Sequence, residues 1–399
     1  MPVTALRREA AVSAPAVTGG LADFARVIFA GGDIQPAWDA LMARAAADPD
    51  DAGALLDLST ILQLVGRRGE GLALQADALA RQRWYRRRIG TGEGPRLLAL
   101  VAAGDMMAST PVEFLLGGWN GELDLVFLTP DQPTPAEIPD HDVAILAVGE
   151  SDANAAILRP LAPTLARWPR PMLNAAAAAV SALGRDRAPA LLAGRPGLAA
   201  PPTRRIGREG LAAAAAALGF PIIARPIDSH AGIGLEKLDD PAAAADYLVR
   251  HPGEVFYVSP FIDYRSPDGR FRKLRVALVD GRPFIVHLAI SDHWMVHYLN
   301  AGMAEDAGKR AKEAAMMASF ESGFARRHAG AFAALHDAFG LDYFAVDCAE
   351  DREGRLLLFE ADTAMIVHDM DPPDLYPYKA PAMKKLFAAF QAMLAARAG

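Results

Sequence analysis

The sequence has little cysteine, and its first residues contain no long apolar run. Cys348 is the one cysteine among 399 residues, so an internal disulfide is impossible and a disulfide-stabilised secreted scaffold is excluded. Residues 1–17 lack the uninterrupted apolar core of a secretory signal peptide. We therefore expect a protein of the reducing cytoplasm.

Membrane-length apolar segments and an excess of basic residues are also lacking. No stretch approaches the roughly 20 uncharged apolar residues that a membrane-spanning helix needs, and even the alanine-rich segment 171–183 is short and weakly apolar. The chain has 41 Lys and Arg against 48 Asp and Glu, which gives a formal net charge of −7. An acidic chain offers no broad attraction for a polyanion. We expect neither a membrane nor a nucleic acid as a partner.

The first 90 residues have the spacing of consecutive helices. Apolar residues recur three and four positions apart over 33–48, 51–66 and 68–88. The pair of helices in 51–88 has about the size and small-residue punctuation of one tetratricopeptide-like repeat. Two interpretations stay open: a helical cap packed on the next domain, or a groove that binds a peptide or protein partner.

The rest of the chain alternates strand-like and helical segments, and its length allows two or three domains. Strand-like runs between helices over 91–200 predict a small parallel sheet. Pro and Gly crowd at 194–203, which predicts a boundary. Residues 201–399 read as an α+β unit with a hairpin turn at Asp280–Gly281. The expected division is 1–90 helical, 91–200 a leading α/β domain and 201–399 a larger α+β domain.

Three acids lie near the ends of two apolar strands. Glu360 and Asp362, in LLLFEAD, fall on one face of a strand by alternation, and Asp347, in YFAVDCA, lies on the neighbouring strand of a hairpin. Converging carboxylates repel one another unless a cation neutralises them, and all-oxygen ligation suits Mg²⁺. The alternatives are acids that solubilise an edge strand or that pair with arginine.

Two further segments carry groups that complement these acids. The small-residue loop after strand 220–225, with Ser229, Gly232 and Gly234, can turn backbone N–H groups inward to hold a phosphate. Alternation along RKLRVALVD places Lys273 and Arg275 on one face of their strand, where both cations can reach the same cleft.

A cluster of histidines and aromatic residues follows the second strand of the hairpin, in HLAISDHWMVHYLNAG at 287–302. Candidate substrate contacts in it are His287, His293, Trp294, His297 and Asn300. Recognition of a substrate and ordinary interface packing are both open. Zinc is a third interpretation, because His293 and His297 have the spacing of a helical metal pair, although no Cys or HExxH glutamate accompanies them.

The order of these parts resembles the ATP-grasp superfamily over roughly residues 95 to 395, and within it the glutathione synthetase and ribosomal-protein glutamate ligase types. The resemblance implies an ATP-grasp fold, in which a small α/β leading domain precedes two α+β subdomains that clasp ATP. It implies ATP and Mg²⁺, as two ions, and an acyl-phosphate route from a carboxylate and an amine to an amide bond. The substrates would be an amino acid, a peptide or a related small molecule.

The resemblance also assigns residues, position by position. Arg275 would steady the transferring phosphate and the developing oxyanion, and Asp347, Glu360 and Asp362 would hold metal. The positions implied for the nucleotide are Arg187, Arg225, Ser229, His230, Gly232, Gly234, Val258, Ser259, Phe261, Ile262 and Lys273.

Several positions depart from the family pattern. Arg225 stands where a phosphate-binding lysine is usual, which keeps the charge but changes the shape of the donor. Asp362 replaces a common Asn, and Ser259–Pro260 stands where Gln–Glu is frequent. A second family lysine is missing, and Arg185 or Arg187 is the nearest substitute. The function predicted is an ATP-dependent carboxylate–amine ligase; the alternative is a tetratricopeptide-type adaptor whose ATP-grasp domain binds nucleotide without turnover.

Overall fold

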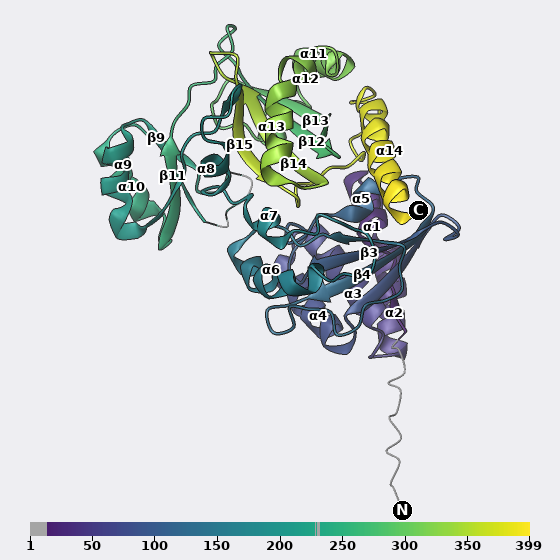
Figure 1. The fold of residues 1–399 in the computed structure, drawn as a ribbon. Helices are drawn as coiled ribbons and strands as arrows, with labels where there is room; N and C mark the ends of the chain where they lie inside the picture. Colours follow the sequence, from purple (N-terminus) through teal and green to yellow (C-terminus); the bar gives the residue numbers. More distant parts are fainter. Residues whose placement is uncertain (1–13, 228, 230–231) are drawn as a thin grey trace, which may run out of the picture.

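Three β-sheets organise the chain in a computed structural model that describes residues 14–227, 229 and 232–399 (Figure 1). The expected α+β class is confirmed, because each sheet carries helices on its faces. His230, assigned to the nucleotide by resemblance, lies outside the described residues.

The first sheet has the strand order β1-β2-β4-β3-β5-β6. Its strands are β1 (Ala16–Val17), β2 (Trp84–Ile89), β3 (Arg96–Ala102), β4 (Gly121–Leu128), β5 (Val143–Leu146) and β6 (Met172–Leu173). Strands β3 to β6 pair in parallel, as expected for 91–200. Strand β5 is buried at every residue, which is typical of a parallel strand covered on both faces.

Four helices precede β2, and of these α3 and α4 pack on the sheet: α1 (Leu21–Phe29), α2 (Gln35–Ala47), α3 (Ala52–Leu64) and α4 (Arg68–Arg81). The helix expected over 68–88 is wrong beyond Arg81. Gln82 is extended, and β2 follows it with Tyr85 and Arg87 buried at a period of two. Strand β2 pairs with β4, so the region expected to be helical, residues 1–90, includes a strand of the first sheet. The tetratricopeptide-like character and the three-part division stay predictions.

The second sheet is antiparallel and forms the lobe at the left of Figure 1. Its order is β10-β9-β11-β8, from β8 (Arg204–Gly207), β9 (Ile222–Pro226), β10 (Glu236–Leu238) and β11 (Val255–Pro260). A short 3-10 helix η1 (Arg208–Gly210), α9 (Leu211–Leu218) and α10 (Pro241–Arg250) cover it. The strand expected at 220–225 is confirmed within two residues as β9.

The third sheet has the order β13-β12-β14-β15-β7. Its strands are β7 (Leu198–Ala199), β12 (Phe271–Val279), β13 (Arg282–Ser291), β14 (Tyr343–Glu350) and β15 (Leu356–Asp362). The hairpin turn expected at Asp280–Gly281 is confirmed, since both residues have the positive φ, 49° and 74°, that a tight primed turn requires. Helices η2 (Tyr298–Asn300), α11 (Ala307–Ser319), α12 (Phe324–Arg327) and α13 (Ala329–Phe339) accompany it.

The closing helix α14 (Lys379–Ala398) joins the first and third sheets. Its buried Met383, Leu386, Phe387 and Phe390 belong to one apolar core with β3, β5, β12 and β14. Helices α5 (Val112–Leu115), α6 (Asp152–Leu165), α7 (Ala177–Ser181) and α8 (Ala188–Leu192) complete the packing between the sheets. Within the part of the chain that is described, no helix is long and apolar enough to cross a membrane.

Candidate active site

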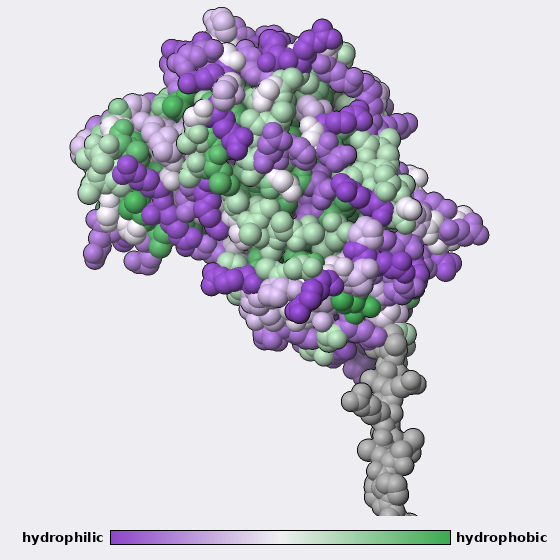
Figure 2. Space-filling view, in the orientation of Figure 1, coloured by the Kyte–Doolittle hydropathy of each residue, from purple (hydrophilic) through white to green (hydrophobic). Residues whose placement is uncertain are grey.

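A cavity of about 440 Å³ lies where the second and third sheets face each other. Its walls come from β9 and β11 on one side, from β12, β14 and β15 on the other, and from segments 183–189, 201–203 and 294–299. The cavity therefore joins parts of the chain that are far apart in sequence. On the face of the molecule seen in Figure 2, hydrophilic residues cover most of the surface, and hydrophobic residues gather near the middle, beside the α9–α10 lobe.

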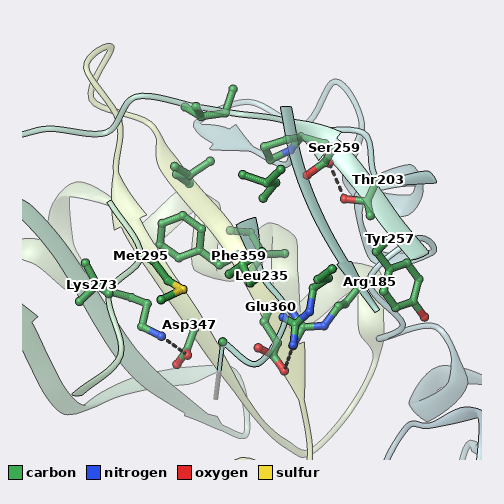
Figure 3. Close-up of a pocket in the computed structure, with 18 of the residues that line it drawn as sticks. Arg185, Thr203, Leu235, Tyr257, Ser259, Lys273, Met295, Asp347, Phe359 and Glu360 are labelled. Carbon is green, nitrogen blue, oxygen red and sulfur yellow. Dashed lines mark hydrogen bonds and ion pairs between the residues drawn. The ribbon is translucent and has the colours of Figure 1, made fainter. Parts of the chain in front are cut away.

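Two opposed carboxylates form the polar end of the cavity. The hairpin β14–β15 pairs Asp347 with Glu360, so the two side chains project together, as alternation predicted. The register shifts next to this pair: Cys348 lies opposite Leu358, which leaves Phe359 as the extra residue of a β-bulge. Phe359 and Glu360 both line the cavity, as do Leu357, Leu358 and Ala361 (Figure 3).

Each of these carboxylates has basic partners. Asp347 accepts hydrogen bonds from Lys273 Nζ at 2.9 Å and from Arg275 Nε at 2.8 Å. Glu360 Oε1 lies 2.5 Å from Arg185 Nη2 (Figure 3). Burial would raise the pKa of Asp347, but Arg275 and Lys273 hold it well below its usual value. Arg185, and then Arg225, likewise hold the pKa of Glu360 below normal against burial.

Asp362 stands apart from the opposed pair. It lies across from Ala345, and its Oδ1 accepts a hydrogen bond from Ala364 N at 2.9 Å. Burial, together with the charge of Glu360, raises the pKa of Asp362 to about 7. The expected convergence of three acids is therefore only partly observed, and the described residues contain no group of three His, Cys, Asp or Glu arranged to hold a metal. Asp347 and Glu360 do offer the hard oxygen donors that suit Mg²⁺.

Arg225 is placed at the end of β9, as expected, and lines the cavity. Its Nε donates to Ser229 Oγ at 3.1 Å, and its Nη2 donates to the Ser229 carbonyl. Burial and the nearby Arg185 lower the pKa of Arg225 to about 10. Gly232 lines the cavity with φ +78°, and a Cβ there would lie 3.2 Å from Met295 Sδ. Gly234 faces Pro226 instead.

The nucleotide positions that the resemblance implies at 258–262 are only partly exposed to the cavity. Ser259, Phe261 and Ile262 line it. Val258 is fully buried in the core of the second sheet, because β11 is the central strand between β9 and β8. The Phe261 N–H already donates to the Pro221 carbonyl at 3.0 Å.

The histidine-rich segment at 287–302 also lies only partly in the cavity wall. Trp294 and His297 line the cavity, and the Trp294 ring packs edge-on against Phe261 at 5.6 Å. His287 lies behind them, opposite Arg275 in the sheet and 4.6 Å from the Tyr298 ring. Burial, followed by Arg275, lowers the pKa of His287 far below its usual value.

The remaining predicted residues of this segment lie away from the cavity. His293 is exposed and its backbone N–H donates to Ser291 Oγ, while Asn300 is exposed and its side chain accepts from His297 N at 3.0 Å. The zinc pair is not formed as expected, because His293 and His297 are not on a shared helix; η2 begins only at Tyr298.

Arg185, rather than Arg187, reaches the cavity. The Arg187 side chain is 43% exposed and pairs with Glu150 at 2.8 Å. Of the two, only Arg185 stands in the cavity wall, so the structure does not bring Arg187 to the cavity.

Sequence reasoning missed the apolar wall of the cavity. Its members include Ile223, Leu235, Tyr257, Met295, Leu358 and Phe359 (Figure 3). Most of them are ordinary strand residues in sequence, and only the pairing of the sheets distinguishes them from core residues. Phe359 in particular needs the bulge, which strict alternation does not predict.

Comparison with known proteins gives distant structural likenesses. No family model matches the sequence, and no curated protein matches it. An ATP-grasp RimK domain protein from Sphaerobacter thermophilus superposes with a TM-score of 0.42 at 19% identity, over 75% of this chain and 99% of that chain. A D-alanine–D-alanine ligase from Bacillus anthracis complexed with ATP gives 0.44 at 12%, over 76% and 97%. The VanG D-Ala:D-Ser ligase from Enterococcus faecalis gives 0.45 at 12%, over 76% and 100%.

Proposed function

We propose that this protein is an ATP-dependent carboxylate–amine ligase of the ATP-grasp type. The observation that carries the proposal is the make-up of the main cavity wall. Part of the wall is apolar, with Phe261, Ile262 and Leu358, and suits a flat heterocycle. The polar part combines the opposed Asp347 and Glu360 with four basic side chains, from Arg185, Arg225, Lys273 and Arg275.

The polar end suits a triphosphate bound with magnesium. Asp347 and Glu360 are the residues that would hold Mg²⁺, which supplies charge neutralisation at the phosphates when bound. Arg185 and Lys273 now neutralise these acids, and both have the charge and the hydrogen-bond donors that phosphate oxygens require. Arg225, at the strand end next to the glycine loop, is the third phosphate contact.

The reaction follows from these placements. A substrate carboxylate attacks the γ-phosphorus of ATP, ADP leaves, and an amine then displaces phosphate from the acyl phosphate to form the amide bond. Arg275 lies in the cavity wall between Asp347 and the Ile366 carbonyl, where its guanidinium can meet the charge that develops on the reacting oxygens. His297 and Trp294 line the same region and are the candidates for substrate contact.

The alternative is a nucleotide-binding adaptor that uses the N-terminal helices to bind a peptide or a protein. The opposed carboxylates beside the basic side chains favour turnover, because this grouping could hold Mg²⁺ and phosphate together. We place the protein in the cytoplasm in either case.

Substrate-dependent ADP release tests the proposal. Purified protein with Mg·ATP is screened against amino acids and peptides, and mass spectrometry identifies any product. The ligase proposal predicts ADP and phosphate in equal amounts, with an amide product whose mass equals the two substrates less one water. Tight ATP binding with no release for any substrate pair would favour the adaptor.

A further inference from the structure

Part of the main cavity wall is a segment without regular structure. Residues 363–371, all of them described by the structure, lie between β15 and α14 and form no helix or strand. We call them the wall segment, because Met365 and Ile366 line the cavity. The Ile366 carbonyl accepts a hydrogen bond from Arg275 Nη1 at 3.1 Å. Without the hydrogen-bond ladder of a helix or a sheet, the position of this carbonyl depends on the side-chain contacts of the segment.

The side chains of the wall segment pack in two directions. Met365 and Val367 belong to the core that α14 forms with the first and third sheets. Ile366 and Met370 pack instead in a separate apolar cluster with α1 and α5, whose buried members include Ala25 of α1. The wall segment is therefore held between the α14 core and the N-terminal helix α1.

Helix α1 makes two further contacts with the wall segment. Arg26 Nη2 donates to Asp369 Oδ1 at 2.8 Å, and the Phe29 ring lies 5.9 Å from the His368 ring. Figure 1 shows α1 beside α5, with which it shares the apolar cluster. One face of α1 thus contacts the segment through an ion pair, a ring contact and the cluster.

Helix α1 is itself fixed to the first sheet. Glu113 of α5 is 8% exposed and accepts hydrogen bonds from Leu21 N and Ala22 N, both at 3.1 Å. A carboxylate suits this place, because the first N–H groups of a helix have no acceptor within it. Arg87 of β2 pairs with Glu113 in turn. The contacts therefore run from β2 through Glu113 and α1 to the wall segment.

The Ile366 carbonyl is the partner of Arg275 that the proposed metal site does not share. Arg275 also donates to Asp347, from Nε at 2.8 Å and from Nη2 at 3.2 Å. Asp347 is a proposed Mg²⁺ ligand, and a bound cation would compete for its oxygens. The Ile366 carbonyl has no such second role, so it keeps the guanidinium in place while Asp347 changes partners.

We propose that helix α1 positions Arg275 for the reaction by holding the wall segment, and with it the Ile366 carbonyl. Met370 is the positioning residue, because it is 8% exposed in the cluster with α1 and is not part of the cavity wall. This inference rests on the proposed ligase function. It makes the N-terminal helix a working part of the ligase rather than a separate module for a partner.

The test measures binding of Mg·ADP by calorimetry, with and without aluminium fluoride, which mimics the transferring phosphoryl group. Met370→Ala removes the contact between the wall segment and α1, and Mg·ADP affinity should stay unchanged. We expect the gain in affinity that fluoride gives to fall roughly tenfold, because a small displacement of a catalytic group is costly. Met393→Ala is the matched control, since Met393 is 6% exposed but packs in the α14 core, and it should keep the full gain.

A double-mutant cycle shows whether the effect passes through Arg275. Arg275→Ala should lose most of the fluoride-dependent gain, and Met370→Ala should add no further loss in that background, because two changes that act through one group are not additive. Arg26→Ala is a second variant, for use if Met370→Ala unfolds at a lower temperature than its control. It removes an exposed ion pair from the α1 side and should lower the gain about twofold.

Hydrogen exchange without nucleotide separates this inference from the ligase function. Met370→Ala should speed exchange in peptides that cover 363–371, and Met393→Ala should not. Unchanged exchange there, equal losses of the fluoride-dependent gain in the two methionine variants, or full additivity with Arg275→Ala overturns the positioning role. Wild-type protein that binds Mg·ADP with no gain from fluoride overturns the ligase function, and the exchange result then decides by itself whether α1 holds the wall segment.

Discussion

At the scale of single residues, the acids of the main cavity form ion pairs with basic side chains. Asp347 is 3% exposed, and an isolated carboxylate so deeply buried would cost several kcal/mol. Lys273 and Arg275 offset that cost, and Arg185 does the same for Glu360. Phosphate oxygens compete for the same donors. We therefore expect nucleotide binding to change the hydrogen-bond partners of these side chains.

Glu360→Gln should remove turnover and leave the fold intact. Glutamine keeps the shape of the side chain and its capacity to accept from Arg185, but it lacks the charge that would hold Mg²⁺. We expect ADP formation to fall to the level seen with excess EDTA, with an unchanged thermal midpoint. Glu350→Gln is a matched control, because Glu350 lies on the neighbouring strand, is 40% exposed and pairs with Arg327. Near-normal ADP formation by Glu360→Gln would refute the metal assignment.

Arg275→Ala should act on the transition state more than on binding. Removal of one donor to a developing oxyanion typically raises the barrier by about 3 to 4 kcal/mol, so kcat should fall by roughly two to three orders of magnitude. ATP affinity should change little, since Lys273 still pairs with Asp347. The control is Arg272→Ala, which removes another cation of β12, one that pairs with Asp268 in the preceding loop. Weaker ATP binding at an undiminished kcat would place Arg275 in nucleotide binding.

At the scale of elements, the sequence predicts most strands and helices but not their irregularities. Alternation identified β12 to β15 and the turn at Asp280–Gly281, because each face of those strands has a consistent character. The bulge at Phe359 depends on cross-strand packing and leaves no local pattern. The sequence predicts helix for β2 because an alanine-rich helical pattern runs into it, with no Gly or Pro between Leu72 and Ile89. The pairing of β2 with β4 overrides this local propensity.

Glu313 links α11 to β13, to η2 and to the residue that precedes α14. It is fully buried on α11 and accepts hydrogen bonds from Leu288 N on β13 at 3.0 Å, from Tyr298 OH at 2.9 Å and from Tyr378 OH at 2.7 Å. Glu313→Ala leaves these buried donors without their acceptor. We expect the free energy of unfolding to fall by about 3 kcal/mol in urea titrations.

The control for this change is Glu321→Ala. Glu321 also links this region to α14, through Lys385 at 2.9 Å, but it is 72% exposed. An exposed ion pair contributes less than about 1 kcal/mol. Equal losses of stability in the two variants would show that the buried network contributes no more than a surface pair.

At the scale of the whole molecule, the main cavity lies where the sheets meet. The second sheet supplies Arg225, the third supplies Asp347 and Glu360, and the segment that follows the first sheet supplies Arg185. The sequence could indicate which residue types carry the chemistry. It could not choose between Arg185 and Arg187, because both lie in a short connection with no periodic pattern and only the docking of the sheets decides which one faces the cavity.

Arg185, in the segment between α7 and α8, is therefore predicted to contact the nucleotide. Its guanidinium lies 2.5 Å from Glu360, and the charge of Glu360, followed by that of Asp362, raises the pKa of Arg185 against the effect of burial. Charge-assisted hydrogen bonds are worth about 1.5 to 3 kcal/mol, so Arg185→Ala should weaken binding of Mg·ATP by roughly ten- to a hundredfold in calorimetric titrations. Arg187→Ala, two residues away and 43% exposed, should bind as the wild type does. If Arg187→Ala weakened binding and Arg185→Ala did not, the nucleotide would contact the connection from the side that Glu150 occupies, and the arrangement proposed for the phosphates would be wrong.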